Sequence, residues 1–408
     1  MRLLERHGFQ VQKYDSFGNP IIVGHIGGQS KRTLLFYNHY DVESPEPLEL
    51  WTTPPFKPAI RGGALYACGA ADDKGEFIAR LAAIDAVQAI KGGTLPCGVT
   101  LVVEGEEEIG SPHLAQFVRE HAEILESQAA IWEDGGTDPE GNPRTDLGYR
   151  GILCIDLVVE TLKMDAHSAA AHIFPNAAWR LLQVLSSLKG EDERILIPGF
   201  YEYARQPSKR DFEMLDILPN YDAWAREAFG IKEFVGGLKS KDLNRAVFNS
   251  TCNIAGFTAG YQGEGSKTII PARANAKVDF RIVPDQDPDD IFNKLRTYLD
   301  QLGFTDVAVL KLAEIWPYKA SVDNPFVLLT KRTAEEVYKR PYLINPIAGE
   351  SGLAYAIANP LGGIPIISAG VGYANNRIHL SDEHIRLNDF FNGARHIARI
   401  LDGFAELS

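Results

Sequence analysis

The chain has 408 residues, of which 45% are hydrophobic and 23% are charged. This composition is that of a globular protein with enough apolar residues for more than one core, so we expect two domains. The formal net charge is −13, and the basic residues form no run or stripe. We therefore expect neither nucleic acid nor an anionic membrane as a partner.

The cysteines stand far apart and show neither a metal-finger spacing nor a secreted disulfide framework: Cys68, Cys97, Cys154 and Cys252. Free thiols in a reducing compartment are the plain interpretation, which predicts a cytoplasmic protein. Charges within residues 1–6 interrupt the apolar stretch that a secretion signal requires. The long uncharged stretch that includes 351–373 contains prolines and glycines that would disturb a membrane helix. We expect no membrane span.

The first part of the chain alternates between two kinds of pattern. Short apolar runs bounded by glycine, proline or charge occur at 33–38, 99–104, 129–133 and 364–368. Helical periodicity occupies 75–91 and 112–126 between some of these runs. Such alternation predicts an α/β domain with a largely parallel sheet and helices on both faces.

From about residue 152 the pattern changes. Strand-like and helical segments follow one another at 153–159, 175–189, 252–259, 274–283 and 288–302. That order predicts a smaller α+β domain inserted into the first. A turn at 323–325 returns the chain to the first domain, which ends with a helix at 386–403. The predicted domains are 1–152 with 321–408, and 153–320. The stretch 200–250 gives no clear prediction.

Acids and histidines recur where the apolar runs end. His39 and Asp41 follow the run at 33–38, and strand alternation places them on the same side. His39 can bind a metal while Asp41 accepts its second N–H. Asp72 and Asp73 open the helix at 75–91, where carboxylates are favoured for structural reasons as well. Taken singly, each pair is also compatible with a purely structural role.

The other acidic groups crowd two turns. Glu106-Glu107-Glu108 follows the run at 99–104, and such like charges are costly unless a cation or a shared proton relieves them. Glu133-Asp134 stands at the end of the run at 129–133, and His379 precedes the last helix. Two divalent ions sharing a carboxylate need about five such ligands, so the sequence contains the required set.

In this order, the motifs resemble the dinuclear-zinc metallopeptidase family of carnosinase-like and cysteinylglycine dipeptidases, glutamate carboxypeptidase, succinyl-diaminopimelate desuccinylase and aminoacylase. The resemblance covers nearly the whole chain. It implies a catalytic domain with a mixed, mostly parallel sheet flanked by helices, and an inserted α+β lid or dimerisation domain. It also implies a homodimer and two divalent metal ions, with zinc expected and manganese or cobalt as alternatives.

The resemblance implies five metal ligands: His39, Asp72, Glu108, Asp134 and His379. His39 and Asp134 would hold one ion, Glu108 and His379 the other, and Asp72 would bridge them. Because Glu133 is also an acid, it stays open whether the ligand at this place is Asp134 or the residue before it. In the family the peptide bond after the bridging aspartate is cis, which predicts a cis bond at Asp72–Asp73.

The resemblance also implies catalytic roles for three residues. Asp41 would orient His39, and Glu107 would act as the general base that takes a proton from a water bridging the two ions. The resulting hydroxide would attack the amide carbonyl. His167, in an Asp-x-His-Ser motif at 165–168, would donate to the oxyanion, in relatives from the other subunit of a dimer.

Three further residues are candidate substrate contacts. Arg281 lies in a run similar to the family's lid-domain signature, where an arginine would bind a substrate carboxylate. Glu350 and Ser351 occupy the place of a glycine-rich substrate loop. Glu350 departs from the usual small residue there, which either favours a basic or free-amine substrate or leaves a solvated side chain.

The choice of reaction within the family depends on Asp134. An aspartate there, and the segment 147–152, are similar to the dipeptidase branch. We therefore expect a metal-dependent hydrolase that cleaves dipeptides or short peptides. An N-acyl-amino-acid amidohydrolase or carboxypeptidase is the enzymatic alternative, and a non-catalytic metal-binding relative is the other.

Overall fold

The computed structural model describes residues 1–407 and divides into two compact units. The first comprises Met1–Leu147, Ala320–Pro346 and Ala354–Ser408. The second comprises Gly148–Lys319 and Ile347–Leu353. The short segment 347–353, which holds Glu350 and Ser351, therefore groups with the second unit. The sequence had led us to expect it in the first domain. Within residues 1–407, no helix has both the length and the apolar character needed to cross a bilayer.

A six-stranded sheet forms the centre of the first unit, in the order β1-β2-β6-β3-β7-β19. Its strands are β1 (Gln10–Tyr14), β2 (Ile21–Ile26), β6 (Gly98–Glu104), β3 (Thr33–His39), β7 (Ala129–Trp132) and β19 (Ile366–Ser368). The four strands from β6 to β19 are parallel, and β1 and β2 join antiparallel at one edge. All residues of β6 and β7 are buried, as expected for parallel strands covered on both faces.

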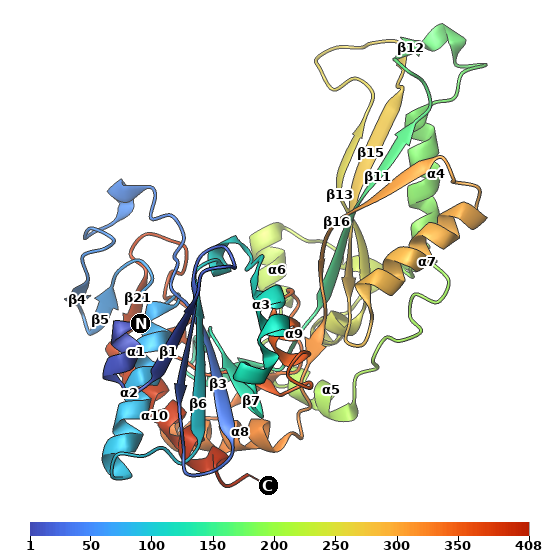
Figure 1. The fold of residues 1–408 in the computed structure, drawn as a ribbon. Coiled ribbons are helices and arrows are strands. Elements are labelled where there is room, and N and C mark those ends of the chain that lie inside the picture. Colours follow the sequence, from blue (N-terminus) through green and yellow to red (C-terminus); the bar gives the residue numbers. More distant parts are fainter. Residues whose placement is uncertain (408) are drawn as a thin grey trace. The chain divides into compact units, whose positions relative to one another are not determined.

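Helices cover both faces of this sheet (Figure 1). α2 (Lys74–Ile90) packs against α10 (Leu387–Phe404), which also contacts α8 (Pro325–Tyr338). The helices α3 (Leu114–Glu120) and α9 (Ala354–Ala358) contact each other on the opposite face. The apolar side of α10 is buried at Ile397, Ile400 and Leu401, as its helical periodicity requires. The predicted α/β architecture is thus confirmed.

Short elements complete the first unit. Two small sheets have the orders β21-β5-β4 and β18-β9-β8-β20. Their strands are β4 (Ala59–Arg61), β5 (Ala64–Tyr66), β21 (His384–Arg386), β8 (Gly136–Thr137), β9 (Pro143–Asp146), β18 (Leu343–Asn345) and β20 (Gly372–Tyr373). The remaining helical segments are α1 (Arg2–Arg6), η1 (Leu48–Leu50), η2 (Glu107–Ile109) and η3 (Ala122–Leu125). η3 and α3 replace the single helix expected at 112–126.

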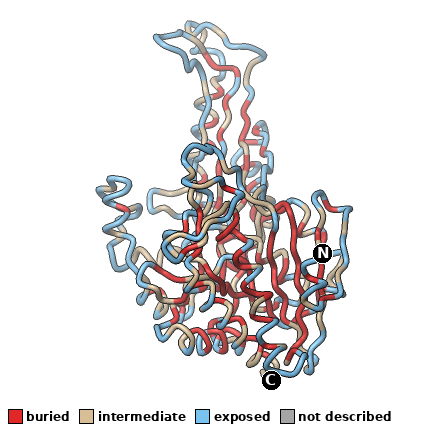
Figure 2. The backbone as a smooth tube through the Cα atoms, turned by 90° about the vertical axis from the view of Figure 1, so that its left-hand side faces the viewer, coloured by how far each residue is buried: buried red, intermediate tan, exposed pale blue. Residues whose placement is uncertain are grey.

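The second unit has its own sheet and its own core. Four antiparallel strands lie in the order β13-β15-β11-β16: β13 (Thr251–Ala259), β15 (Arg273–Ile282), β11 (Gly151–Glu160) and β16 (Val307–Ile315). Alternate residues of β11 are buried and pack with α4 (Ala177–Leu188) and α7 (Pro288–Gln301). Figure 2 shows this burial along the strands. Asn176 and Asp287 cap the two helices through their side chains.

The rest of the second unit consists of short elements. They are β10 (Gly148–Tyr149), β12 (Ala166–His167), β14 (Ile269–Ile270), β17 (Tyr318–Lys319), α5 (Lys209–Leu215), α6 (Asp222–Phe229), η4 (Ser168–Ala170), η5 (Val235–Gly237), η6 (Ser240–Asp242) and η7 (Asn244–Phe248). Much of the stretch 200–250 is therefore helical, although its sequence allowed no prediction.

Candidate metal centre

The carboxyl end of β3 positions His39. The residue is 1% exposed, and its backbone N–H donates to the Asp73 carboxylate at 3.0 Å. The ring nitrogen Nδ1 lies 3.2 Å from Asp41 Oδ1, and Nε2 lies 2.7 Å from Asp72 Oδ1. Asp41 therefore faces one ring nitrogen and leaves Nε2 directed at the other acids, which is the orientation that metal binding by Nε2 requires.

Asp72 lies in the turn before α2, and the Asp72–Asp73 peptide bond is cis, as the family resemblance predicted. The Glu383 carboxylate holds this turn. It accepts hydrogen bonds from the backbone N–H groups of Gly69, Ala71 and Asp72 at 2.7, 2.7 and 3.0 Å. Glu383 is 4% exposed, so a buried acid fixes the backbone that carries the candidate bridging residue.

The acidic turn after β6 brings a second set of groups to the same place. The Glu108 backbone N–H donates to Asp41 Oδ2 at 3.0 Å, so one carboxylate contacts both the β3 end and this turn. Glu108 Oε2 lies 3.0 Å from His379 Nε2, and His379 Nε2 lies 3.1 Å from Asp72 Oδ2. Asp72 thus reaches His39 with one oxygen and His379 with the other, which is the geometry of a bridging carboxylate.

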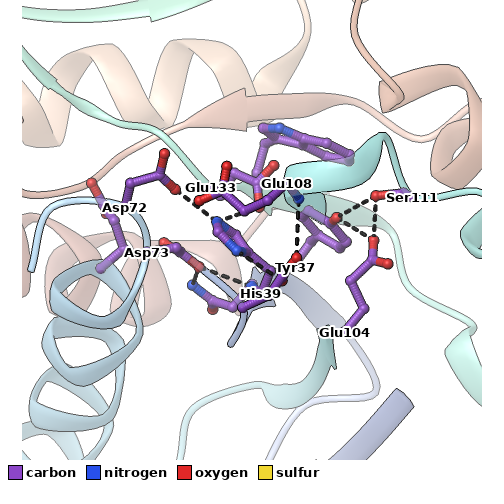
Figure 3. A network of polar contacts seen from close by, with 12 residues as sticks. Tyr37, His39, Asp72, Asp73, Glu104, Glu108, Ser111 and Glu133 are labelled. Carbon is purple, nitrogen blue, oxygen red and sulfur yellow. Dashed lines mark hydrogen bonds and ion pairs between the residues drawn. The ribbon is translucent and has the colours of Figure 1, made fainter. Parts of the chain in front are cut away.

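The turn after β7 presents two acids in different surroundings. Glu133 is 2% exposed, and its Oε2 lies 3.9 Å from His39 Nε2 (Figure 3). Asp134 is exposed and has a backbone φ of 58°. His379 has a φ of 60°. Such left-handed conformations are uncommon outside glycine and often occur at functional sites.

The donor groups fit divalent cations. Three sets of side chains place their ligand atoms within 4.8 Å of one another: His39, Asp72 and Glu108; His39, Asp73 and Glu133; and Glu43, Glu108 and His379. Carboxylate oxygen and imidazole nitrogen are the ligands that zinc, manganese and cobalt accept. A buried Glu133 oxygen without a hydrogen-bond partner among residues 1–407 is a further sign that a cation belongs here. The residues present therefore fit a metal site.

The pKa values of the clustered side chains also indicate a place where positive charge is favoured. Burial opposes protonation of His39, but hydrogen bonds to Asp41 and Asp72 raise its pKa to about 12. Burial raises the pKa of Glu107, the charge on His39 opposes this rise, and the charges of Asp72 and Glu108 add to it, which together gives a pKa of about 7. Burial and the charge on Asp72 also raise the pKa of Glu108. Bound cations would relieve this repulsion between carboxylates.

A buried arginine contacts the segments that carry the candidate ligands. Arg80 on α2 is fully buried and donates to the backbone oxygens of Tyr37 and Trp132, each at 2.5 Å, and to Asn38 Oδ1 at 2.7 Å. Asn38 in turn donates to Asp73 at 2.6 Å. One guanidinium thus links β3, β7 and the turn before α2 just behind the candidate ligands.

The remaining predicted residues belong to the second unit and are described within it. Arg281 Nη1 donates to Ser351 Oγ at 2.7 Å, and the Glu350 carbonyl accepts from the Arg150 backbone N–H at 3.0 Å. Arg150 also donates to the Arg281 carbonyl oxygen at 3.2 Å. His167 pairs with residue 269, before β15 begins, whereas Arg281 lies at the end of β15. The structure thus joins Arg281 with Ser351 and leaves His167 at the other end of the strand.

Sequence reasoning missed several residues of the site. Asp73 does not cap α2 with its side chain, as its position suggested, but holds Asn38 and the His39 backbone. Glu383 and Glu43 were not singled out. The role of Glu383 depends on backbone groups more than 300 residues away, which no local pattern indicates. Its position four residues after His379 was the one available signal.

Comparison with known proteins identifies the family. The model of peptidase family M20/M25/M40 matches residues 35–403. The chain belongs to this family. It is 23% identical to the probable di- and tripeptidase DUG2 of Saccharomyces cerevisiae, with 94% of the chain and 44% of that protein covered. It is 25% identical to Beta-Ala-His dipeptidase of Rattus norvegicus, with 95% and 80% covered. The chain thus spans less than half of one curated relative and four fifths of the other.

A solved structure is similar over the whole chain. The M20 family metallo-carboxypeptidase Sso-CP2 from Sulfolobus solfataricus has a TM-score of 0.85 and 32% sequence identity. The match covers 100% of this chain and 93% of that one. The chain therefore shares its fold and about a third of its sequence with this metallo-carboxypeptidase.

Proposed function

We propose that this protein is a metal-dependent hydrolase that cleaves the amide bond of dipeptides or short peptides. The observation that carries the proposal is the Asp72 carboxylate, whose two oxygens face His39 at 2.7 Å and His379 at 3.1 Å. Two curated relatives named as peptidases with dipeptide or tripeptide substrates support the same reaction class.

Five side chains are proposed as the ligands of two divalent ions, with zinc expected and manganese or cobalt as alternatives: His39, Asp72, Glu108, Asp134 and His379. When bound, such ions polarise the substrate carbonyl and lower the pKa of water. Asp41 keeps the His39 ring oriented, and Glu383 keeps the Asp72 backbone in place.

Glu107 is proposed as the general base. Its raised pKa, about 7, allows it to exchange a proton near neutral pH. Glu107 would take a proton from the attacking water and return it to the leaving amine. Its neighbour Glu108 is held by the Glu43 backbone N–H at 2.9 Å and faces His379, which favours a ligand role for Glu108 and the base role for Glu107.

The second unit is proposed to bind substrate and a second copy of the chain. Arg281, whose Nη1 contacts Ser351, would bind a substrate carboxylate, with Glu350 beside it. His167 would donate to the oxyanion from the partner subunit of a homodimer. Exposed apolar side chains in this unit support a contact between copies: Met164, Ile173, Phe174 and Trp179. All four cysteines are free, which supports a reducing, cytoplasmic location.

A carboxypeptidase or N-acyl-amino-acid amidohydrolase is the second candidate. It is favoured by the similarity to a metallo-carboxypeptidase, at 32% identity over the whole chain. The two candidates differ in the substrate's N-terminus, because a dipeptidase requires a free α-amino group and the second class accepts a blocked one.

Turnover of a paired substrate panel tests the proposal. Free dipeptides and their N-acetylated or N-succinylated counterparts would be offered to protein reloaded with Zn²⁺, Mn²⁺ or Co²⁺, with a chelated sample as the control. We expect cleavage of free dipeptides. Cleavage of only the blocked substrates would assign the carboxypeptidase or amidohydrolase reaction. Failure to cleave either set would contradict catalysis and favour a non-catalytic metal-binding protein.

A further inference from the structure

Asp382 is a carboxylate near the metal centre that belongs to none of the three sets of candidate ligand atoms within residues 1–407. Its Oδ1 accepts a hydrogen bond from the Thr52 backbone N–H at 3.0 Å, and its Oδ2 accepts one from the Thr52 hydroxyl at 2.6 Å. Arg61 Nη2 also donates to Oδ1, at 3.2 Å. One carboxylate therefore holds two positions that lie more than 300 residues earlier in the chain.

The contacts of Asp382 are charge-assisted. Burial opposes ionisation of this carboxyl, but the hydrogen bonds from Thr52 and Arg61 hold its pKa below the ordinary value. Arg61 belongs to β4, which pairs with β5, and β5 pairs with β21 two residues after Asp382. The Arg61 guanidinium also lies over the Tyr66 ring, 3.9 Å from its centroid. Hydrogen bonds between ionised groups are stronger than neutral ones, so Asp382 attaches Thr52 firmly to this small sheet.

The two segments that Asp382 joins both line a pocket beside the metal centre. Trp51, directly before Thr52, lines this pocket, and so does Ser381, directly before Asp382. The candidate ligand His379 is part of the same lining. A substrate held at the metal ions makes its binding contacts with the residues around them. The position of Trp51 relative to His379 therefore matters for substrate binding.

Trp51 is also held within its own segment. Its indole Nε1 donates to the Pro45 carbonyl oxygen at 2.8 Å, and its backbone N–H donates to the Leu48 carbonyl oxygen at 3.2 Å. These bonds fix Trp51 relative to residues 45–48. The contact of this segment with the turn that carries His379 is made by Asp382.

We propose that Asp382 is a positioning residue for substrate binding: it keeps the Trp51 segment beside the His379 turn and so fixes the shape of the pocket that both segments line. This proposal rests on the proposed function, because it requires the pocket to bind substrate. Asp382 itself binds neither the ions nor the substrate. Its loss should therefore weaken substrate binding and leave the metal ions and the chemical step in place.

Kinetics of the Asp382→Ala variant test the proposal. Wild-type and variant protein would be loaded with Zn²⁺ or Mn²⁺, the bound metal counted by elemental analysis, and turnover measured on the substrates that the wild-type protein cleaves. We expect KM to rise by about tenfold while kcat changes by less than about twofold and two ions stay bound. In the metal-free variant, hydrogen exchange should become faster in residues 48–56, which include the Thr52 N–H, and stay unchanged in β3 and β6.

Further variants change the same contact from its other side. Thr52→Val removes the hydroxyl and keeps the backbone N–H, so it should raise KM by a smaller factor, and it serves if Asp382→Ala does not fold. Combining it with Asp382→Ala should raise KM no further, because both changes act on one contact. Asp382→Asn keeps an acceptor for the Thr52 N–H and should recover part of the wild-type affinity.

Asp402→Ala is the matched control. Asp402 lies on α10 and pairs with Lys91 at 2.7 Å, so this variant also removes an aspartate from an ion pair. Neither residue lines the pocket. The control should keep the wild-type KM, kcat and exchange pattern.

Three outcomes would contradict the proposal. An unchanged KM in Asp382→Ala, or in Thr52→Val if Asp382→Ala does not fold, would show that the contact does not shape substrate binding. A fall in kcat with loss of an ion would show that Asp382 supports the metal centre instead of the pocket. A wild-type protein that binds two ions and cleaves neither free nor blocked substrates would overturn the proposed function itself, which separates that failure from the failure of Asp382 alone.

Discussion

The three glutamates of the turn after β6 have different surroundings, although they are adjacent in sequence. Glu106 accepts from the Asn19 backbone N–H at 3.0 Å and contacts His113 at 2.6 Å. Glu108 faces His379. The Glu107 carboxylate is only partly buried and is held by no hydrogen bond from residues 1–407. A group that is free to move and has a raised pKa is suited to carrying a proton.

Substitution of Glu107 should separate catalysis from metal binding. In Glu107→Gln we expect kcat to fall by roughly 10²–10⁴-fold while the bound metal content stays at the wild-type value. Turnover and elemental analysis of the same preparation give both quantities. Glu106→Gln, the same change one residue away, is the control and should keep its activity. Loss of an ion from Glu107→Gln would show that the roles of Glu107 and Glu108 are exchanged.

A buried histidine far from the acidic turn should make stability depend on pH. His396 on α10 is 2% exposed and donates from Nε2 to the Thr330 carbonyl oxygen at 3.1 Å. Burial lowers its pKa from 6.5 to about 4. The unfolded chain therefore binds this proton at a higher pH than the folded chain. The stabilisation is complete above pH 6.5 and is lost as the pH falls toward 4, by about 3 kcal/mol in total.

Urea unfolding at pH 7.5 and pH 5.0 measures this effect. Carboxylates also contribute to the pH dependence, so the comparison is with His396→Gln, which lacks the titrating ring. The wild-type protein should lose more free energy of unfolding between the two pH values than the variant does. Equal losses would show that His396 is not buried in its neutral form.

At the residue scale, the sequence identified most of the acids and histidines that the structure brings together. His39, Asp72, Glu108 and His379 follow recognisable motifs, and their contacts at 2.7 to 3.1 Å agree with that grouping. The direction of neighbouring side chains could not be predicted. Glu133 is buried and lies 3.9 Å from His39, and Asp134 has a backbone φ of 58°, and no local pattern in the sequence indicates either.

Arg80 illustrates how elements are held together behind the cluster. Its guanidinium contacts the ends of β3 and β7 and, through Asn38, the turn before α2. Arg80→Met should lower the free energy of unfolding by about 3–5 kcal/mol, because it leaves buried acceptors without their charged partner. Urea unfolding measures this change.

The control for that experiment is Arg119→Met. Arg119 is an exposed arginine on α3, so its substitution should change the free energy of unfolding by no more than about 0.5 kcal/mol. Similar losses for the two variants would contradict the role given to the buried Arg80 side chain.

At the element scale, strong local signals gave good predictions. The helix expected at 288–302 is α7 (Pro288–Gln301), with Asp287 as its cap and Pro288 at its first position. The helix α8 (Pro325–Tyr338) was missed, although Asn324 and Pro325 give it the same kind of start. Those residues were interpreted as a turn alone. The strand β16 was also missed, because most of its residues are exposed and its apolar alternation is weak.

At the scale of the whole molecule, the core of the second unit should unfold without disturbing the metal centre. Leu181 on α4 is fully buried among residues of β11 and β15. Leu181→Ala should cost about 2–5 kcal/mol in this core. Hydrogen exchange should therefore become faster in β11 and β15, while exchange in β3 and β6 and the metal content stay unchanged.

Leu182→Ala is the matched control, because the adjacent Leu182 is 45% exposed. It should leave exchange close to the wild-type pattern. Equally faster exchange in β3 and β6 of the Leu181→Ala variant would show that the two units unfold together.

The order of strands and helices predicted an α/β domain and an inserted α+β domain, since a βα alternation differs from the pattern of strands and helices after residue 152. The grouping of Ile347–Leu353 with the second unit was not predicted. That grouping depends on backbone pairing, such as the Ala348 N–H with the Gly148 carbonyl oxygen at 2.8 Å. A contact between residues that are 200 positions apart leaves no local pattern in the sequence.

Dipeptide turnover measured against the number of bound ions tests the central claim most directly. Metal-free protein would be loaded stepwise with Zn²⁺ or Mn²⁺, and hydrolysis of free dipeptides followed at each step together with bound metal. We predict that hydrolysis requires bound metal and reaches its full rate at two ions per chain. Full turnover in the metal-free protein, or none with two ions bound, would contradict the dinuclear hydrolase built on Asp72 and Glu107.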